Sequence, residues 1–549
     1  RHNITLPNHM SIWRAARSLE EGGGAFIGRS EAEYTTLILE SVKAVFAVRL
    51  HIGIRPLHDM SLLNPPLILT EPAFYRHAYR RMKPEGPFAD KVVANALRML
   101  QTQRGLCNEA TEEFIKELSG SGEAQRLIAE RRQELNTLTL GVGLKAAQTC
   151  SAVMRLSPGV NHVFSALSVY ANNIRSTKME ARLKSRRLFE KIQADLKQAV
   201  GEERIAFIID HGGPLKIVCD APIEWLPLGN LPLSMRFDCS RINATPGNLM
   251  MGQLTGTPAL TFQPTDLQKI LVVSSFADDD PLRNVLTDAL GAIRERWEGK
   301  TELIFKVVKD QAEFIDALNA FDGYIMIFDG HGADNADEPV GKIVLGKDPI
   351  DVWNLRGQVR IPPIVILSAC DTHGVDASSH ATVGNGFLAL DARTVLATLL
   401  PVGGLASAAF IGRLIYRIAD FLPAALKAEQ RVLNWTEVIA GMLRMLLASE
   451  MLDHLVGPPA PAESPRGKIQ SLANIEINMR DDEWYDKFLD RIAAHRGEAR
   501  ERVDSRAAGI LARCEAIRYV QLGNPETILI DDGTIYDRVM KEYGQGEAT

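Results

Sequence analysis

The sequences YIMIFDGHG, residues 324–332, and IVILSACDT, residues 364–372, decide the fold of this chain. Each begins with a short apolar run rich in β-forming residues and ends in turn residues, which is typical of a buried strand. His331 follows the first run and Cys370 follows the second. In an open parallel sheet, ligands bind beyond the carboxyl ends of the strands. We therefore expect His331 and Cys370 to lie at the same end of one sheet, as a candidate base and nucleophile.

The sequence around these two runs alternates short apolar segments with helical patterns. Further strands are predicted at 205–209, 216–219, 269–275, 302–308 and 394–400, with a small insert at 342–355. Asp280, followed by Pro281, is expected to cap a helix that runs to about Trp297. This alternation predicts an α/β fold with a mostly parallel sheet flanked by helices. The acidic segment after the strand at 269–275 would repel a pyrophosphate, so dinucleotide binding is not expected.

The two flanks of this region are predicted to be helical. Residues 1–200 form a mainly helical N-terminal region, 201–456 the α/β domain, and 457–549 a proline-rich linker with a C-terminal helical extension. The charged extension is expected to form one helix around 481–518. Helices are predicted in the N-terminal region at 30–48, 72–82, 89–103, 108–118, 122–136, 137–156, 161–173 and 176–200.

The composition limits the classes of function. With 549 residues, two or three domains are expected. A net charge of −6 leaves no footprint for nucleic acid. The six cysteines include no CxxC pair, which argues against a zinc site or a disulfide scaffold and favours a reducing compartment. The start has no apolar signal segment, and the uncharged stretch 395–412 is broken by proline and glycine, so neither secretion nor a membrane span is expected. We expect a cytoplasmic protein without a cofactor or a metal.

The two motifs also carry a family resemblance. GHG at 330–332 and SACDT at 368–372 resemble the paired motifs of CHAT-domain proteins, which are relatives of caspases and separases. The similarity runs from about residue 205 to about residue 425 and includes DAPIEWLP at 220–227. The resemblance implies a caspase-like fold and the activity of a cysteine endopeptidase.

The resemblance assigns roles to residues of this chain. A thiol is nucleophilic as the thiolate, so the imidazole of His331 would take the proton of Cys370. The backbone N–H groups of Gly332 and Cys370 would form an oxyanion hole, and no third acidic residue is required by the family. The position two before the cysteine, Ser368, would line the substrate pocket. Asp329 and Asp371 are further pocket candidates, as are Asp220 and Glu224, although each acid is equally explained as a turn, a cap or a solvated charge.

Several alternatives stay open at this stage. Cys370 could be a buried core cysteine and His331 a loop residue, or His373 could be the base. The first functional hypothesis is an endopeptidase that cleaves a protein partner, regulated by a second protein bound to the N-terminal helices; the resemblance suggests bacterial antiviral defence. The other is a catalytically silent scaffold. The polar loop 371–385 is either a mobile activation loop or a passive connection.

Overall fold

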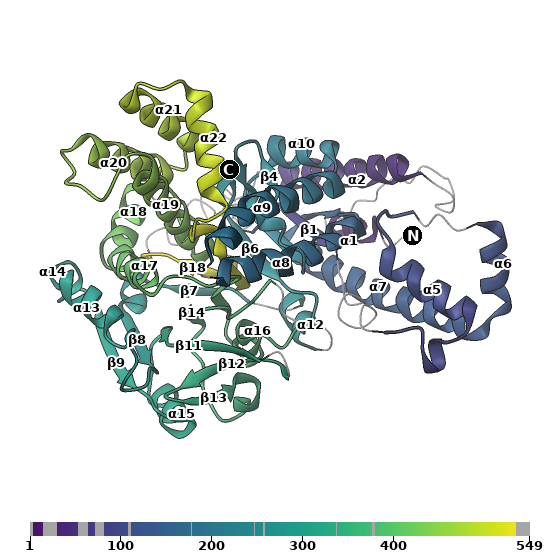
Figure 1. The fold of residues 1–549 in the computed structure, drawn as a ribbon, viewed down its shortest axis with the longest axis horizontal. Coiled ribbons are helices and arrows are strands. Elements are labelled where there is room, and N and C mark those ends of the chain that lie inside the picture. The colour runs from purple at the N-terminus through teal and green to yellow at the C-terminus, as the bar shows by residue number, and fades with distance from the viewer. Residues whose placement is uncertain are drawn as a thin grey trace, which may run out of the picture. The chain divides into compact units, whose positions relative to one another are not determined.

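The computed structural model describes residues 4–14, 30–52, 64–71, 82–107, 111–176, 178–245, 248–255, 258–335, 338–375, 379–429 and 431–533 (Figure 1). The chain divides into two compact units. Unit 1 comprises residues 1–165, 193–223 and 241–258, and unit 2 comprises residues 166–192, 224–240 and 259–549. Four elements contain residues of both units: α8 (Phe164–Arg175), α9 (Met179–Val200), the short 3-10 helix η4 (Ile223–Trp225) and β6 (Cys239–Ile242).

Unit 1 packs helices on a parallel sheet whose strands run in the order β2-β1-β3. Ile68, Val153 and Val218 of these strands are buried against apolar residues of α7 and α12. The strands are β1 (Leu67–Glu71), β2 (Ala152–Arg155) and β3 (Leu215–Cys219). The helices are α1 (Leu6–Arg14), α2 (Glu31–Ile52), α5 (Lys91–Thr102), α6 (Glu112–Gly120), α7 (Gly122–Thr149), α10 (Glu202–His211) and α12 (Asn248–Leu254).

The structure corrects three predictions in unit 1. The helices expected at 122–136 and 137–156 are one helix, α7, which ends where Cys150 takes a left-handed conformation, with φ of 51°. The next residues form β2, because Val153 and Met154 pair with β1 and are buried. The apolar run at 205–209 belongs to helix α10 and not to a strand, since acidic residues in its first turn suit a helix N-terminus. The helix expected at 72–82 lies almost wholly outside the described residues.

Unit 2 contains the sheet that carries both sequence motifs. Its strands run in the order β17-β15-β14-β10-β8-β9, and all neighbours are parallel except β17, which is antiparallel to β15. The predicted α/β class, with a mostly parallel sheet flanked by helices, is confirmed. The strands are β8 (Lys269–Ser274), β9 (Glu302–Val307), β10 (Ile325–Asp329), β14 (Ile364–Ser368), β15 (Thr394–Thr398) and β17 (Tyr519–Gly523).

Smaller strands and many helices surround this sheet. The insert after β10 is an antiparallel sheet of β11 (His331–Asn335), β12 (Glu338–Leu345) and β13 (Asp348–Asp351). The helices are α11 (Leu233–Arg236), α13 (Val285–Ala292), α14 (Arg294–Trp297), α15 (Gln311–Asn319), α16 (Val383–Ala389), α17 (Gly404–Tyr416), α18 (Leu422–Glu429), α19 (Trp435–Leu455), α20 (Pro465–Asn478), α21 (Trp484–Arg496) and α22 (Arg500–Leu511). Short strands are β4 (Pro227–Leu228), β5 (Leu231–Pro232), β7 (Leu260–Phe262), β16 (Leu433–Asn434) and β18 (Ile528–Ile530).

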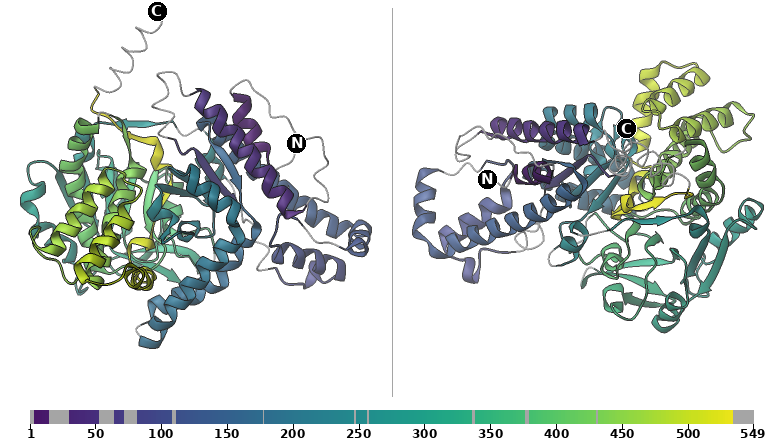
Figure 2. Two further views of the ribbon diagram at one scale, coloured as in Figure 1. Left: turned by 90° about the horizontal axis from the view of Figure 1, so that it is seen from above. Right: turned by 180° about the vertical axis from the view of Figure 1, so that it is seen from behind.

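The C-terminal segment differs from its prediction. The single helix expected around 481–518 is two helices, α21 and α22, because Gly497 takes a left-handed conformation, with φ of 63°, after α21. The chain then returns to the central sheet as β17, beside β15. Helices α19 to α22, yellow-green in Figure 2, lie together on unit 2. The extension is therefore part of the body of unit 2.

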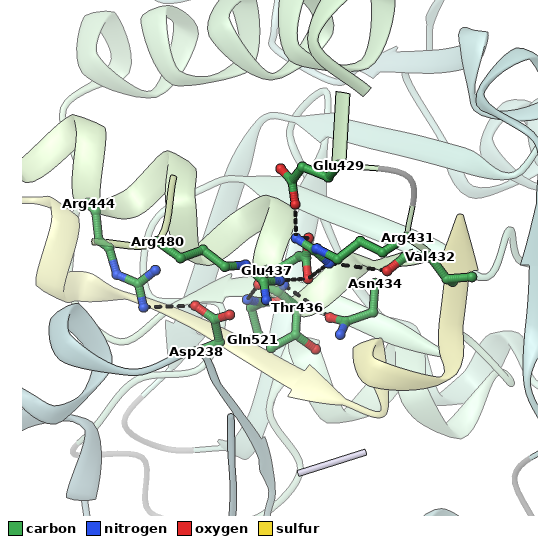
Figure 3. Close-up of polar contacts among 10 residues, drawn as sticks. All are labelled: Asp238, Glu429, Arg431, Val432, Asn434, Thr436, Glu437, Arg444, Arg480 and Gln521. Carbon is green, nitrogen blue, oxygen red and sulfur yellow. Dashed lines mark hydrogen bonds and ion pairs between the residues drawn. The ribbon is translucent and has the colours of Figure 1, made fainter. Parts of the chain in front are cut away.

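A polar network fixes β17 and the start of α19 (Figure 3). Asn434 caps the helix by accepting a hydrogen bond from the N–H of Glu437, whose carboxylate pairs with Arg431 and Arg480. The amide of Gln521 on β17 donates to the carbonyl of Thr436 at 3.0 Å. These contacts hold the antiparallel strand in register beside the strands that carry the site.

Candidate active site

His331 stands directly beyond the carboxyl end of β10 and is oriented by an acid. Its Nε2 lies 2.6 Å from Oδ2 of Asp280, which follows β8 in the chain. The other oxygen of Asp280 accepts the N–H of Leu282 at 2.8 Å. Burial alone would raise the pKa of Asp280, but the hydrogen bonds from Leu282 and His331 outweigh it and lower that pKa. Asp280 is therefore held as a carboxylate against the imidazole.

The surroundings of His331 restrict its ring further. The ring stands edge-on to that of Phe276, with 5.0 Å between centroids and an interplanar angle of 88°. Its side chain is 44% exposed, so one side of the ring remains open to solvent. The helix that we expected to begin at Pro281 begins instead at Val285, after a turn that Asp280 caps. This turn is what places the Asp280 carboxylate within reach of His331.

Cys370 lies beyond the carboxyl end of β14, the strand next to β10. Its thiol donates to the carbonyl oxygen of Val402 with an S···O distance of 3.4 Å. Burial raises the pKa of this thiol above its ordinary value, and the negative charge of Asp371 adds to the effect. In this conformation Cys370 is therefore protonated at neutral pH, and its hydrogen bond points to the segment that follows β15.

The backbone brings the histidine and cysteine segments into contact. Strands β10 and β14 are parallel neighbours, as the sequence predicted, and Asp329 lies opposite Ser368. Gly332, three residues after Asp329, meets Cys370, two residues after Ser368: a side chain at Gly332 would collide with the carbonyl oxygen of Cys370, so only glycine allows this approach. The two N–H groups expected to form an oxyanion hole thus belong to segments that touch.

The pocket candidates have different surroundings. Ser368 and Asp329 are buried, and the Ser368 hydroxyl donates to Oδ1 of Asp329 at 3.0 Å while lying 2.9 Å from the hydroxyl of Ser407. Asp371 is partly buried and forms a two-fold ion pair with Arg175. Asp220 accepts the N–H of Ala244 within unit 1, and Glu224 is buried in unit 2. Ser368 and Asp329 form an internal polar layer at the carboxyl ends of β14 and β10.

Asp329 should make the stability of the protein depend on pH. Burial raises its pKa from 3.8 to about 7, against the opposing effects of the Ser368 hydrogen bond and the His331 charge. Because the folded state holds this proton more tightly, the stabilising contribution of Asp329 is complete below the unfolded pKa and is lost as the pH rises through about 7.

The wild type loses stability as the pH rises from about 4 to about 8, whereas Asp329→Asn does not. Over this range we expect the free energy of unfolding of Asp329→Asn to increase relative to that of the wild type by up to about 4 kcal/mol. Urea unfolding at about pH 5 and pH 8 measures this difference. The exposed Asp348→Asn serves as the control and should show no such trend. A constant difference between Asp329→Asn and the wild type at the two pH values would contradict the assignment.

The described part of the loop after Cys370 is anchored to β15 and to the segment that follows it. The N–H groups of His373 and Val375 donate to the carbonyls of Thr398 and Leu399 at 2.9 and 3.0 Å. His373, the alternative base, is buried, and its Nδ1 lies 2.9 Å from the hydroxyl of Thr382. Residues 376–378 lie outside the described residues. The expected mobility of this loop stays a prediction.

Sequence reasoning missed the two charged partners of the site. Asp280 was expected only as a helix cap; the signal that could have revealed its second role is its position after β8, whose carboxyl end lies beside that of β10. Arg175 is 196 residues from Asp371 in sequence, and no local pattern links them. Within the described residues, no group of three or more His, Cys, Asp or Glu side chains could hold a metal ion. No described helix is long and apolar enough to cross a membrane.

Of three comparisons with known proteins, the match to a family model agrees with the family resemblance. A structure search found a match to the Arg-specific cysteine proteinase gingipain R, with 11% sequence identity and a TM-score of 0.30, covering 65% of this chain and 70% of that chain. A likeness this low says nothing about the site. A search of curated proteins found no match. The family model of the CHAT domain matches residues 185–437, which include both His331 and Cys370. The part of the chain that carries both motifs is therefore similar to CHAT domains.

Proposed function

We propose that the chain is a cysteine endopeptidase of the CHAT type, which cleaves a protein substrate with Cys370 as nucleophile and His331 as base. The observation that carries this proposal is the contact between the His331-Gly332 segment and Cys370 at the carboxyl ends of two parallel strands. The ordered partner of the imidazole, Asp280, adds to it. A base that is itself oriented by a third group is the general arrangement of an activated nucleophile.

The chemistry follows from which ring nitrogen is engaged. With Nε2–H donated to Asp280, Nδ1 is the nitrogen left to accept the thiol proton of Cys370. The thiolate attacks the substrate carbonyl carbon, and the N–H groups of Gly332 and Cys370 stabilise the oxyanion. The imidazolium then protonates the leaving amine as the C–N bond breaks. Water, losing its proton to Nδ1, hydrolyses the thioester and restores the thiol.

The position of the thiol favours a resting state in the protein alone. A thiol that donates to Val402 and has a raised pKa supplies little thiolate at neutral pH. Catalysis requires the sulfur to turn from this carbonyl toward His331. The same observation favours the second candidate function, a catalytically silent scaffold, in which the thiol would keep its bond to Val402 when partners bind.

Asp280 should affect the rate of peptide cleavage by orienting His331 and stabilising its imidazolium form. We expect Asp280→Asn to lower kcat/KM by about 10²–10⁴-fold, because the amide no longer fixes the tautomer or stabilises the imidazolium. The acid limb of the pH profile of kcat/KM should also move to lower pH. Asp279→Asn is the matched control, since Asp279 is 78% exposed and pairs only loosely with Lys347. An unchanged pH profile in Asp280→Asn would show that the carboxylate does not act on the base.

Regulation by a partner is the second part of the proposal. It rests on Arg175, which links α8 to the residue that follows Cys370. Arg175 is the last residue of α8, and its guanidinium donates to both oxygens of Asp371, at 2.9 and 3.0 Å. Asp371 is the residue after the nucleophile and has φ of 52°, which is uncommon for a residue other than glycine. We propose that a protein bound to the N-terminal helical region moves α8, releases Asp371 and lets Cys370 turn toward His331.

Arg175→Gln should release this constraint without a partner. We expect the rate of alkylation of Cys370 by a peptide-based electrophile to rise about tenfold, the effect of roughly 1.4 kcal/mol in a conformational equilibrium. Arg186→Gln is the control, since Arg186 lies on α9 and forms an exposed ion pair with Glu190 on the same helix. A slower reaction in Arg175→Gln would mean that the ion pair supports the competent form instead.

The proposed activity is tested on a proteome-derived peptide library. The wild-type protein and Arg175→Gln are incubated with the library, and new N termini are identified by mass spectrometry. We expect cleavage at a recurring residue type, with more products from Arg175→Gln. Absence of new N termini with both proteins, while Cys370 still reacts with a small alkylating reagent, would favour the scaffold.

A further inference from the structure

Strand β9 leaves an unusual edge on the sheet of unit 2. It ends the strand order, with β8 on one side, and no described strand pairs with its other side (Figure 1). Its sequence ELIFKV is mostly exposed, and Phe305 and Val307 are 43% and 53% exposed. Proteins usually keep such edges short, charged or covered, because the unpaired backbone is a template for another strand. An edge strand of six residues with four apolar side chains and an unpaired backbone is therefore expected to bind a further strand.

The direction of the free backbone groups follows from one hydrogen bond. The N–H of Val308 donates to the carbonyl of Ser274 on β8 at 2.9 Å. Backbone groups alternate in direction along a strand, so those of Lys306 and Ile304 also face β8. The N–H and C=O groups of Leu303, Phe305 and Val307 therefore point away from the sheet, toward the open side.

We propose that β9 pairs antiparallel with β9 of a second copy of this chain, with the two Ile304 residues opposite each other. In this register Leu303 lies opposite the partner's Phe305, and both are residues whose backbone groups point outward, as a hydrogen-bonded pair requires. Glu302 then lies opposite the partner's Lys306, and Lys306 opposite the partner's Glu302. One face of the pairing joins apolar side chains and the other joins opposite charges.

Neighbouring registers lack this complementarity. A two-fold centre at Phe305 would place Lys306 opposite the partner's Ile304, and a centre at Leu303 would place Glu302 opposite the partner's Ile304. Only the centre at Ile304 pairs both charges of the strand with opposite charges. The self-complementary order of Glu302, Ile304 and Lys306 is what identifies a second copy as the occupant, and not a strand of unrelated sequence.

The pairing joins two central sheets into one continuous sheet, independently of whether Cys370 is catalytic. A pair of six-residue strands buries less than the roughly 800 Å² per partner of a standard interface, so the dimer should be weak and concentration-dependent. Sedimentation velocity of the full chain from about 1 to 100 µM should therefore show a shift from the monomer toward the dimer.

Charge reversal tests the register. Glu302→Lys and Lys306→Glu each place like charges opposite one another twice, and each should weaken the homodimer about tenfold. An equimolar mixture of these two variants restores both opposite-charge pairs, so it should form a heterodimer of wild-type strength, as should the double reversal by itself. Glu295→Lys, on exposed α14, makes the same charge change outside the strand and should leave dimerisation unchanged.

Phe305→Pro tests the backbone. Its N–H points outward, so proline removes a donor to the second copy and none to β8, and dimerisation should be lost while the melting temperature changes little. A chain that stays monomeric at about 100 µM would overturn the proposal. So would a dimer that is insensitive to Phe305→Pro, or a mixture of the two single reversals that does not associate better than either alone.

Discussion

Replacing Cys370 with alanine should reduce peptide-bond cleavage to background and leave the fold intact. The loss is complete because no other group of the site can form the acyl intermediate, and removal of a nucleophile typically costs 10⁴-fold or more. The fold should persist, since the side chain is partly exposed and its one hydrogen bond goes to the carbonyl of Val402. Cleavage of the peptide library and thermal unfolding measure the two effects.

The matched control for Cys370→Ala is Cys107→Ala. Cys107 is the other cysteine that is partly exposed, whereas the remaining four are buried. Its removal should leave cleavage unchanged. Cleavage by Cys370→Ala at the wild-type rate would end the proposal of an enzyme with this nucleophile.

His331→Ala should lose nearly as much activity as Cys370→Ala. Without the imidazole, the thiol keeps the raised pKa that burial gives it and has no base to take its proton. The double variant should be no worse than either single variant, because the two residues act as one unit. Initial rates on one cleaved peptide measure all three. Activity that survives in His331→Ala and disappears in His373→Ala would assign the base to His373.

The parts of the fold that the sequence predicted share a regular pattern. The runs at 324–328 and 364–367 are apolar, bounded by turn residues and followed by family motifs, and they became β10 and β14. The apolar run at 205–209 is followed by the turn residues DHGG but preceded by the charged residues EER, which belong to the same helix. A short apolar run fits a buried helix as well as a strand. Strand β17 was missed because it gains its partner, β15, from a distant part of the chain.

In the candidate site, too, the residues within local motifs were predictable from the sequence, and the contacts between distant elements were not. The sequence predicted that His331 and Cys370 follow the ends of neighbouring strands, because each stands in a motif after an apolar run, and β10 and β14 place them there. It could not foresee that Asp280 contacts His331 or that Arg175 contacts Asp371, since these ion pairs depend on how separate elements pack. It also could not show that Ser368 would be buried.

A peptide-based electrophile, followed by mass spectrometry of the digested protein, tests the central claim most directly. Exposure alone predicts reaction at both Cys107 and Cys370, because both are partly exposed. The raised pKa of the Cys370 thiol would by itself slow the reaction at Cys370. Catalysis by a His331–Cys370 pair predicts that the adduct forms on Cys370 before Cys107, and that this preference is lost in His331→Ala. Equal or faster labelling of Cys107, or labelling of Cys370 at the same rate with and without His331, would contradict the account.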